Sequence, residues 1–161
     1  FDATLATWVG ETPGTCTFAQ TCGGNSVIEH NGDLYPCDHF VYKDYLLGNI
    51  TEKPIAEMMR SDKQTAFGID KRNKLPTKCL RCEWLFACNG ECPKHRFNTY
   101  ESHQSGRGGV RIETGLNALC DGYKMFFSHV APYMDYMKDL LSRKMSPAYV
   151  IPWARSRANQ Q

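Results

Sequence analysis

The clearest hydrophobic periodicity in this sequence lies near its C-terminal end. Large apolar side chains recur every three or four residues over 123–141, which is the repeat of a helix with one buried face. Pro132 interrupts this run, and proline lacks the backbone N–H that a helix interior requires. The pattern therefore predicts two helical segments, over residues 121–131 and 132–144, that pack against a core. Residues 146–161 contain two further prolines and are predicted to form a tail.

The run SVIEHNGDLYPC, residues 26–37, has the pattern of a β-hairpin. Its apolar pairs Val27-Ile28 and Leu34-Tyr35 flank Asn31-Gly32, and Asn-Gly is a strong signal for a tight hairpin turn. Such a hairpin returns Cys37 towards the residues that precede the first strand. Together with the predicted helices, it places the chain in the α+β class.

The sequence TEKPIAEMMRSDKQTAFG, residues 51–68, predicts a further helix. Thr51 suits the N-cap, Pro54 is tolerated in the first turn, and Gly68 fits the end of the helix. The basic run KRNKLPTK, residues 71–78, then follows as an expected solvated loop.

Two stretches show no regular pattern. Residues 1–15 fit either a terminal strand or the tail of a preceding domain, and both interpretations stay open at this point. Residues 98–115 are polar and rich in glycine, including Ser105-Gly106-Arg107-Gly108-Gly109. This composition predicts a flexible loop.

Composition and charge exclude several classes of function. Of the 161 residues, 42% are hydrophobic and 22% charged, and the net charge is +2. This charge gives no reason to expect a nucleic-acid partner. No apolar run approaches the roughly 20 residues of a membrane span, so no membrane partner is expected. The N-terminal residues lack a basic start and an apolar signal core, which favours the cytoplasm. Because the chain starts at Phe1, we expect it to be part of a longer protein.

The most informative chemistry lies in the stretch CLRCEWLFACNGEC, residues 79–92. The eight cysteines of the chain are Cys16, Cys22, Cys37, Cys79, Cys82, Cys88, Cys92 and Cys120. Two sets of four thiolates match the ligand number of two zinc or iron–sulfur sites. Only one C-x2-C pair occurs, whereas zinc ribbons use two, so the irregular spacing favours iron–sulfur. A structural zinc-binding interaction module and a secreted disulfide framework remain the alternatives.

Residues beside the cysteines are further candidates. Asp38 follows Cys37 directly, so it is either a functional carboxylate near a metal or an ordinary solvated side chain. His39 fits a packed or partly exposed ring better than a ligand, because eight cysteines already complete two sites. Trp84, Leu85 and Phe86 are expected to shield a metal site from water, to form core, or both.

The cysteines and their neighbours resemble a known domain. The pattern Cys16-x5-Cys22-x14-Cys37, then CLRCEWLFACNGEC, then Cys120 looks like a SPASM domain, the twin-cluster extension of certain radical S-adenosylmethionine enzymes. The stretches IEHNGDLYPCDHFVY, LGNI and KCLRCEWLFACNGECPKHRF are similar to the anaerobic sulfatase-maturating enzymes in that group. Their hallmark Cys-Asp-His-Phe is present as residues 37–40. The departure is a longer insertion around residues 100–115.

This resemblance implies site residues and a domain organisation. One auxiliary 4Fe-4S cluster would be held by Cys16, Cys22, Cys37 and Cys92, and a second by Cys79, Cys82, Cys88 and Cys120. Asp38 would be the general base. Residues 1–15 would end, or link to, a missing radical S-adenosylmethionine barrel, with Trp8 at the join. Residues 16–120 would form the SPASM domain, and residues 121–161 a C-terminal helical segment and tail.

The family's reaction oxidises a Cys or Ser of an unfolded sulfatase polypeptide to formylglycine. A radical derived from S-adenosylmethionine removes a hydrogen atom, a base removes a proton, and one electron leaves. An electron carrier such as flavodoxin or ferredoxin is the further partner implied. The C-x3-C-x2-C motif of the S-adenosylmethionine-cleaving cluster, a third 4Fe-4S cluster, is absent here, so the chain alone is expected to be inactive. Zinc is expected as a substitute metal in aerobic preparations, and another peptide-modifying SPASM enzyme remains an alternative.

Overall fold

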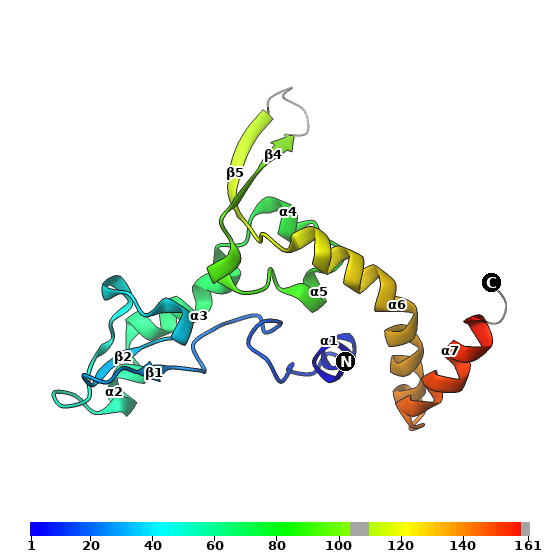
Figure 1. Ribbon diagram of the computed structural model, residues 1–161, viewed down its shortest axis with the longest axis horizontal. Coiled ribbons are helices and arrows are strands. Elements are labelled where there is room, and N and C mark those ends of the chain that lie inside the picture. The colour runs from blue at the N-terminus through cyan, green and yellow to red at the C-terminus, as the bar shows by residue number, and fades with distance from the viewer. Residues whose placement is uncertain (104–109, 159–161) are drawn as a thin grey trace.

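The computed structural model describes residues 1–103 and 110–158, and it has the mixed α+β architecture that the sequence predicts. Figure 1 shows a short sheet with α2 and α3 at one end, the bent helix α6 at the other, and a hairpin of β4 and β5 projecting between them. The elements in order are α1 Asp2–Trp8, β1 Val27–Ile28, β2 Asp33–Tyr35, η1 Asp38–Phe40, η2 Lys43–Tyr45, β3 Gly48–Asn49, α2 Ile55–Met59, α3 Asp62–Asn73, α4 Thr77–Leu80, α5 Leu85–Cys88, η3 Pro93–His95, β4 Asn98–His103, β5 Val110–Leu116, α6 Cys120–Ser142, η4 Pro147–Tyr149 and α7 Val150–Ala158.

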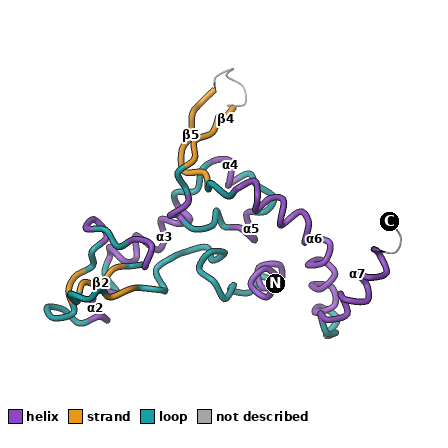
Figure 2. Tube along the Cα trace, in the orientation of Figure 1, coloured by secondary structure: helices purple, strands orange, loops and turns teal. Residues whose placement is uncertain are grey.

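The hairpin predicted around Asn31-Gly32 is confirmed. Strands β1 and β2 are antiparallel, with Val27 opposite Tyr35, and β3 pairs antiparallel with the other edge of β2. Gly32 has φ of 87°, a value that glycine adopts without strain. Figure 2 shows that a long loop connects α1 to this sheet. That loop carries Cys16 and Cys22.

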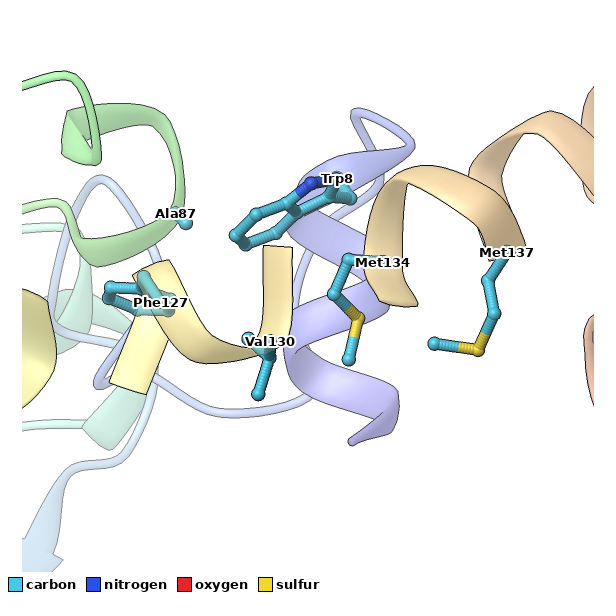
Figure 3. Packing of buried hydrophobic residues seen from close by; sticks show 6 residues of the cluster. All are labelled: Trp8, Ala87, Phe127, Val130, Met134 and Met137. Atoms are coloured by element: carbon cyan, nitrogen blue, oxygen red, sulfur yellow. The ribbon is translucent and has the colours of Figure 1, made fainter. Parts of the chain in front are cut away.

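The main hydrophobic core lies where α1, α5 and α6 meet. Figure 3 shows Trp8, Ala87, Phe127 and Val130 lying together, with the two methionines further along α6. The buried members of this cluster are Trp8, Ala87, Phe127, Val130, Met134 and Met137. The indole nitrogen of Trp8 also donates to Asp135 at 2.9 Å. Residues 1–15 therefore do not form a strand, and Trp8 belongs to the core of this chain.

The C-terminal pattern forms one helix where two were predicted. Helix α6 runs from Cys120 to Ser142 with Pro132 inside it, and Figure 1 shows it changing direction along its length. Proline removes one helical hydrogen bond, but the apolar stripe on both sides packs on the same core and keeps the helix continuous. The predicted tail is also wrong, because residues 147–158 form η4 and α7.

The helix predicted over residues 51–68 is divided and displaced. Pro54 precedes α2, and a new helix, α3, begins after Ser61, whose hydroxyl accepts the N–H of Gln64 at 3.2 Å. Gly68 lies inside α3, which continues to Asn73, so it does not end the helix as predicted. A local capping signal at Ser61 thus prevailed over the one expected at Thr51.

The glycine-rich stretch is mostly a hairpin, not the predicted loop. Strands β4 and β5 pair antiparallel, with Asn98 opposite Leu116 and His103 opposite Val110. The Tyr100 hydroxyl donates to Glu113 at 2.5 Å, and the Thr77 N–H donates to the same carboxylate at 3.1 Å. The first bond links the two strands, and the second joins the hairpin to α4. Residues 104–109 of the predicted loop lie outside the described residues.

Candidate metal centres

Four cysteines that lie in or next to α4, α5 and α6 line one pocket. Cys79 comes from α4, Cys82 follows it, Cys88 ends α5 and Cys120 begins α6. Trp84, Leu85, Tyr123 and Phe127 complete the wall on the apolar side. The shielding role expected for Trp84 and Leu85 fits this position, whereas Phe86 is 48% exposed and contacts Trp8 instead.

The other four cysteines gather on the side of the first sheet. Cys16 and Cys22 lie in the long loop, Cys37 follows β2, and Cys92 follows α5. Their thiols are electrostatic neighbours. Cys16 and Cys92 act on the pKa of Cys22, and Cys92 acts on that of Cys37. The equivalent effects on Cys79 and Cys88 come from Cys82 and Cys120. We call Cys79, Cys82, Cys88 and Cys120, which line one pocket, the helix group. We call Cys16, Cys22, Cys37 and Cys92 the sheet group.

Both groups have thiols with raised pKa values. Burial is the main cause in every case, and it raises the pKa of Cys37 and of Cys88 to about 11. A thiol is the weaker metal ligand, since metals bind the thiolate. A bound cation lowers such a pKa outright. Cys16 is exposed, the other seven cysteines are half-buried, and none of the eight forms a disulfide, so their thiols are available to a metal or cluster.

Asp38 lies exposed at the start of η1. Its Oδ1 accepts a hydrogen bond from the Cys37 thiol at 3.3 Å and another from the His39 N–H at 3.1 Å. The thiol hydrogen bond is the main reason that the pKa of Asp38 is lowered. Once Cys37 binds a metal as thiolate, it has no proton to donate. The carboxylate would then keep the bond from the His39 N–H, and its Oδ1 could accept another donor in place of the thiol.

His39 lies near the sheet group but was not expected to be a ligand. Its ring is exposed, and its Nδ1 lies 3.6 Å from Cys92 Sγ. One possible ligand atom from each of Cys37, Asp38 and His39 falls within 4.8 Å of the others. The structure therefore places three polar side chains at the solvent side of the sheet group.

Sequence reasoning missed a buried polar face on α3. Gln64, Gly68 and Lys71 are all buried, at positions i, i+4 and i+7. The Cys22 N–H donates to the Gly68 carbonyl at 3.0 Å, and a Cβ on Gly68 would lie 2.7 Å from the Cys22 carbonyl oxygen. Lys71, predicted to be solvated, is 1% exposed. Helical spacing of small and polar residues was the available signal, and it indicates a face that packs on backbone.

The comparisons with known proteins agree with this architecture. Residues 16–83 match the SPASM family model, described as an iron-sulfur cluster-binding domain. Among solved structures, the native anaerobic sulfatase-maturating enzyme anSMEcpe with bound AdoMet and Cp18Cys peptide is similar at a TM-score of 0.68 and 26% identity. That likeness covers 87% of this chain and 36% of the solved one.

Curated relatives show which enzymes this chain is similar to. The chain is 52% identical over 151 residues to a serine-type anaerobic sulfatase-maturating enzyme of Bacteroides thetaiotaomicron, covering 94% of this chain and 34% of the relative. It is 30% identical over 132 residues to a cysteine-type enzyme of Clostridium perfringens, covering 82% and 33%. The chain therefore spans about a third of the length of the curated relatives it matches.

These findings define the class as an iron–sulfur cluster-binding SPASM domain. Within that class, the chain carries the SPASM domain of the anaerobic sulfatase-maturating enzymes, as its Cys-Asp-His-Phe sequence suggested. No helix in the described part of the chain combines the length and apolar character needed to cross a membrane.

Proposed function

We propose that the sheet group and the helix group each hold one auxiliary 4Fe-4S cluster. The first would be bound by Cys16, Cys22, Cys37 and Cys92, and the second by Cys79, Cys82, Cys88 and Cys120. The observation that carries this proposal is the pocket lined by Cys79, Cys82, Cys88 and Cys120. For the sheet group, α3 holds the backbone of Cys16 and Cys22, and His39, two residues after Cys37, lies 3.6 Å from Cys92 Sγ. With four thiolates each, neither site leaves an iron open to substrate, and such centres supply single-electron transfer when bound.

We further propose that the whole protein oxidises a sulfatase side chain to formylglycine. The change from CH₂–OH to CHO requires loss of one hydrogen atom, one proton and one electron. The hydrogen atom would go to a radical derived from S-adenosylmethionine, which is generated outside this chain. The proton would go to a base, and the electron would go to a redox centre. In this chain, Asp38 offers an exposed carboxylate beside Cys37, which suits acceptance of the proton from the substrate hydroxyl.

A serine is the substrate side chain that the comparisons favour. The chain is 52% identical to a serine-type relative and 30% identical to a cysteine-type relative. We therefore propose an unfolded sulfatase segment with a serine as the partner, and a small electron carrier such as flavodoxin or ferredoxin as a second partner in the cytoplasm. Full-length enzyme given matched serine and cysteine peptides should convert the serine peptide faster, and the reverse preference would contradict this assignment.

The Asp38 proposal is tested by Asp38→Asn in the full-length enzyme. Removing a general base typically costs about 100-fold or more in rate, so formylglycine formation should fall by that order while both clusters remain. Asp44→Asn is the matched control, because Asp44 is an exposed carboxylate in the next helical turn, η2. Wild-type turnover by Asp38→Asn would remove the base assignment. Conversion of unrelated peptides but not sulfatase peptides would favour a different maturase.

A further inference from the structure

A three-residue segment connects the two groups of thiols. Residues 89–91 join Cys88 of the helix group to Cys92 of the sheet group. All three have positive φ, at 48° for Asn89, 70° for Gly90 and 55° for Glu91. Non-glycine residues adopt such angles at a cost and keep them only when surrounding contacts require it. The separation of the two groups thus depends on what holds this segment.

The guanidinium of Arg96 holds the whole segment. It donates from Nε to the Gly90 carbonyl at 2.9 Å, and from Nη2 to the carbonyls of Asn89 at 3.0 Å and Glu91 at 3.1 Å. Its Nη1 donates to the Lys71 carbonyl on α3 at 2.6 Å. A Cβ on Gly90 would lie 2.7 Å from Nη2, so the segment packs directly against the cation.

A buried cation, Lys71, lies beside the half-buried Arg96. The Lys71 ammonium is 1% exposed as a residue and donates to the carbonyls of Cys16 at 2.5 Å and Thr17 at 2.9 Å. Within residues 1–103 and 110–158, neither Lys71 nor Arg96 forms a salt bridge with a carboxylate. Buried charges are normally paired, and neutral carbonyls do not neutralise them. An anion is therefore expected nearby.

The cysteines are the groups placed to supply that negative charge. Arg96 donates to the three carbonyls between Cys88 and Cys92, so it lies beside a cysteine of each group, and its charge acts to lower the pKa of Cys79 and of Cys22. Lys71 donates to the carbonyl of Cys16, and its charge acts to lower the pKa of Cys22 and of Cys92, both in the sheet group. Arg96 thus faces both groups of cysteines, whereas Lys71 faces the sheet group.

We propose that Arg96 is a counter-ion shared by both auxiliary clusters, and that Lys71 is a counter-ion of the sheet-group cluster alone. This inference rests on the proposed function, because it needs clusters at both groups. A cluster bound by four thiolates gains one negative charge when it accepts one electron, and a fixed cation nearby stabilises that charge. Arg96 therefore positions both clusters and makes both easier to reduce.

The test uses the full-length protein, with the S-adenosylmethionine-cleaving cluster deleted and the two auxiliary clusters reconstituted anaerobically. Midpoint potentials are measured by titration followed by EPR in wild type, Arg96→Gln, Arg96→Lys, Lys71→Gln and the exposed control Arg60→Gln. Arg96→Gln should shift both potentials to more negative values. Lys71→Gln should shift one potential only, Arg96→Lys should shift less than Arg96→Gln, and Arg60→Gln should shift neither.

Other outcomes overturn the inference. Unchanged potentials in Arg96→Gln and Lys71→Gln at full iron content would show that the cations do not act on the clusters. If Arg96→Gln loses iron, the potentials of Lys71→Gln provide the test. Equal shifts of both cluster potentials in Lys71→Gln, or no shift of either, would contradict the proposal. Iron loss in Arg96→Gln, Arg96→Lys and Lys71→Gln alike would assign Arg96 and Lys71 to folding alone. Absence of two 4Fe-4S clusters in wild type is a different result, which overturns the proposed function itself.

Discussion

The helix group and the sheet group of cysteines are surrounded by different kinds of contact. The helix group lies against an aromatic core, in which Trp84 and Tyr123 stack on Phe127 with ring centroids 6.2 and 6.0 Å apart. The sheet group lies between a long loop, a short sheet and the polar face of α3. There, backbone atoms are held by Gln64, which donates to the Gly23 carbonyl at 2.6 Å, and by Lys71.

This difference indicates two ways of holding a metal centre in a small domain. Burial of large apolar side chains stabilises the helix group without a metal, at about 1.5–3 kcal/mol for each side chain fully buried. The sheet group depends on hydrogen bonds, which contribute about 0.5–1.5 kcal/mol each, and on the buried ammonium of Lys71, which needs an anion. We expect the sheet group to be the part of the chain whose order depends most on its cluster.

The largest expected effect is the loss of one cluster. Cys92→Ala removes a ligand of the sheet group and Cys120→Ala removes one of the helix group. After anaerobic reconstitution, each variant should retain about half of the wild-type iron. Hydrogen exchange should show wider loss of protection in Cys92→Ala, over β1–β3 and α3, than in Cys120→Ala. Equal loss of both clusters in Cys92→Ala would contradict the ligand sets, and equal loss of protection would contradict the comparison.

A smaller effect is expected from the core behind the helix group. Phe127 is fully buried, and Phe127→Ala should lower the free energy of unfolding by about 3–5 kcal/mol. Its neighbour Phe126, 40% exposed, provides the matched control, and Phe126→Ala should cost much less. Denaturant unfolding of the metal-free protein measures both. Similar costs for the two variants would show that the aromatic core does not stabilise this region.

The smallest effect concerns the hairpin of β4 and β5, whose Glu113 accepts the N–H of Thr77 at the start of α4. The hydrogen bond from Tyr100 is the main reason that the pKa of Glu113 is lowered from 4.5 to about 2. A lowered folded-state pKa gives stabilisation that is complete above about pH 4.5 and is lost as the pH falls towards 2. Glu113→Gln should speed hydrogen exchange in the hairpin at pH 7 and remove its dependence on acid. Formylglycine formation should not change, and slower turnover would assign the hairpin a role in the reaction.

Local sequence signals predicted part of the fold. Asn31-Gly32 specified its hairpin because the turn type is set by those two residues. The helix ends predicted at Pro132 and Gly68 were wrong. The core on both sides of Pro132 keeps α6 continuous, and Gly68 is required by the close approach of the Cys22 backbone. Tertiary packing, which no local window contains, decided both. The β4–β5 hairpin was missed because its strands are polar and largely exposed.

The assignment of the cysteines as ligands stays a prediction, whereas the surroundings of the cysteines were predicted poorly. Thiol spacing is visible in the sequence, and the resemblance supplied the two sets and Asp38. Lys71 and Arg96 were missed because both occur in basic runs that look solvated. Lys71 is buried where the loop of Cys16 and Thr17 crosses α3, and Arg96 holds the segment between Cys88 and Cys92. The sequence reveals neither contact.

The central claim is that eight cysteines hold two 4Fe-4S clusters. It is tested most directly by iron and acid-labile sulfide analysis of the anaerobically reconstituted chain, with Mössbauer spectra of the same sample. The account predicts about eight irons and eight sulfides per chain, all in 4Fe-4S form. Two tightly bound zinc ions and no uptake of iron under these conditions would contradict it, and would leave Asp38, Lys71 and Arg96 without redox centres to serve.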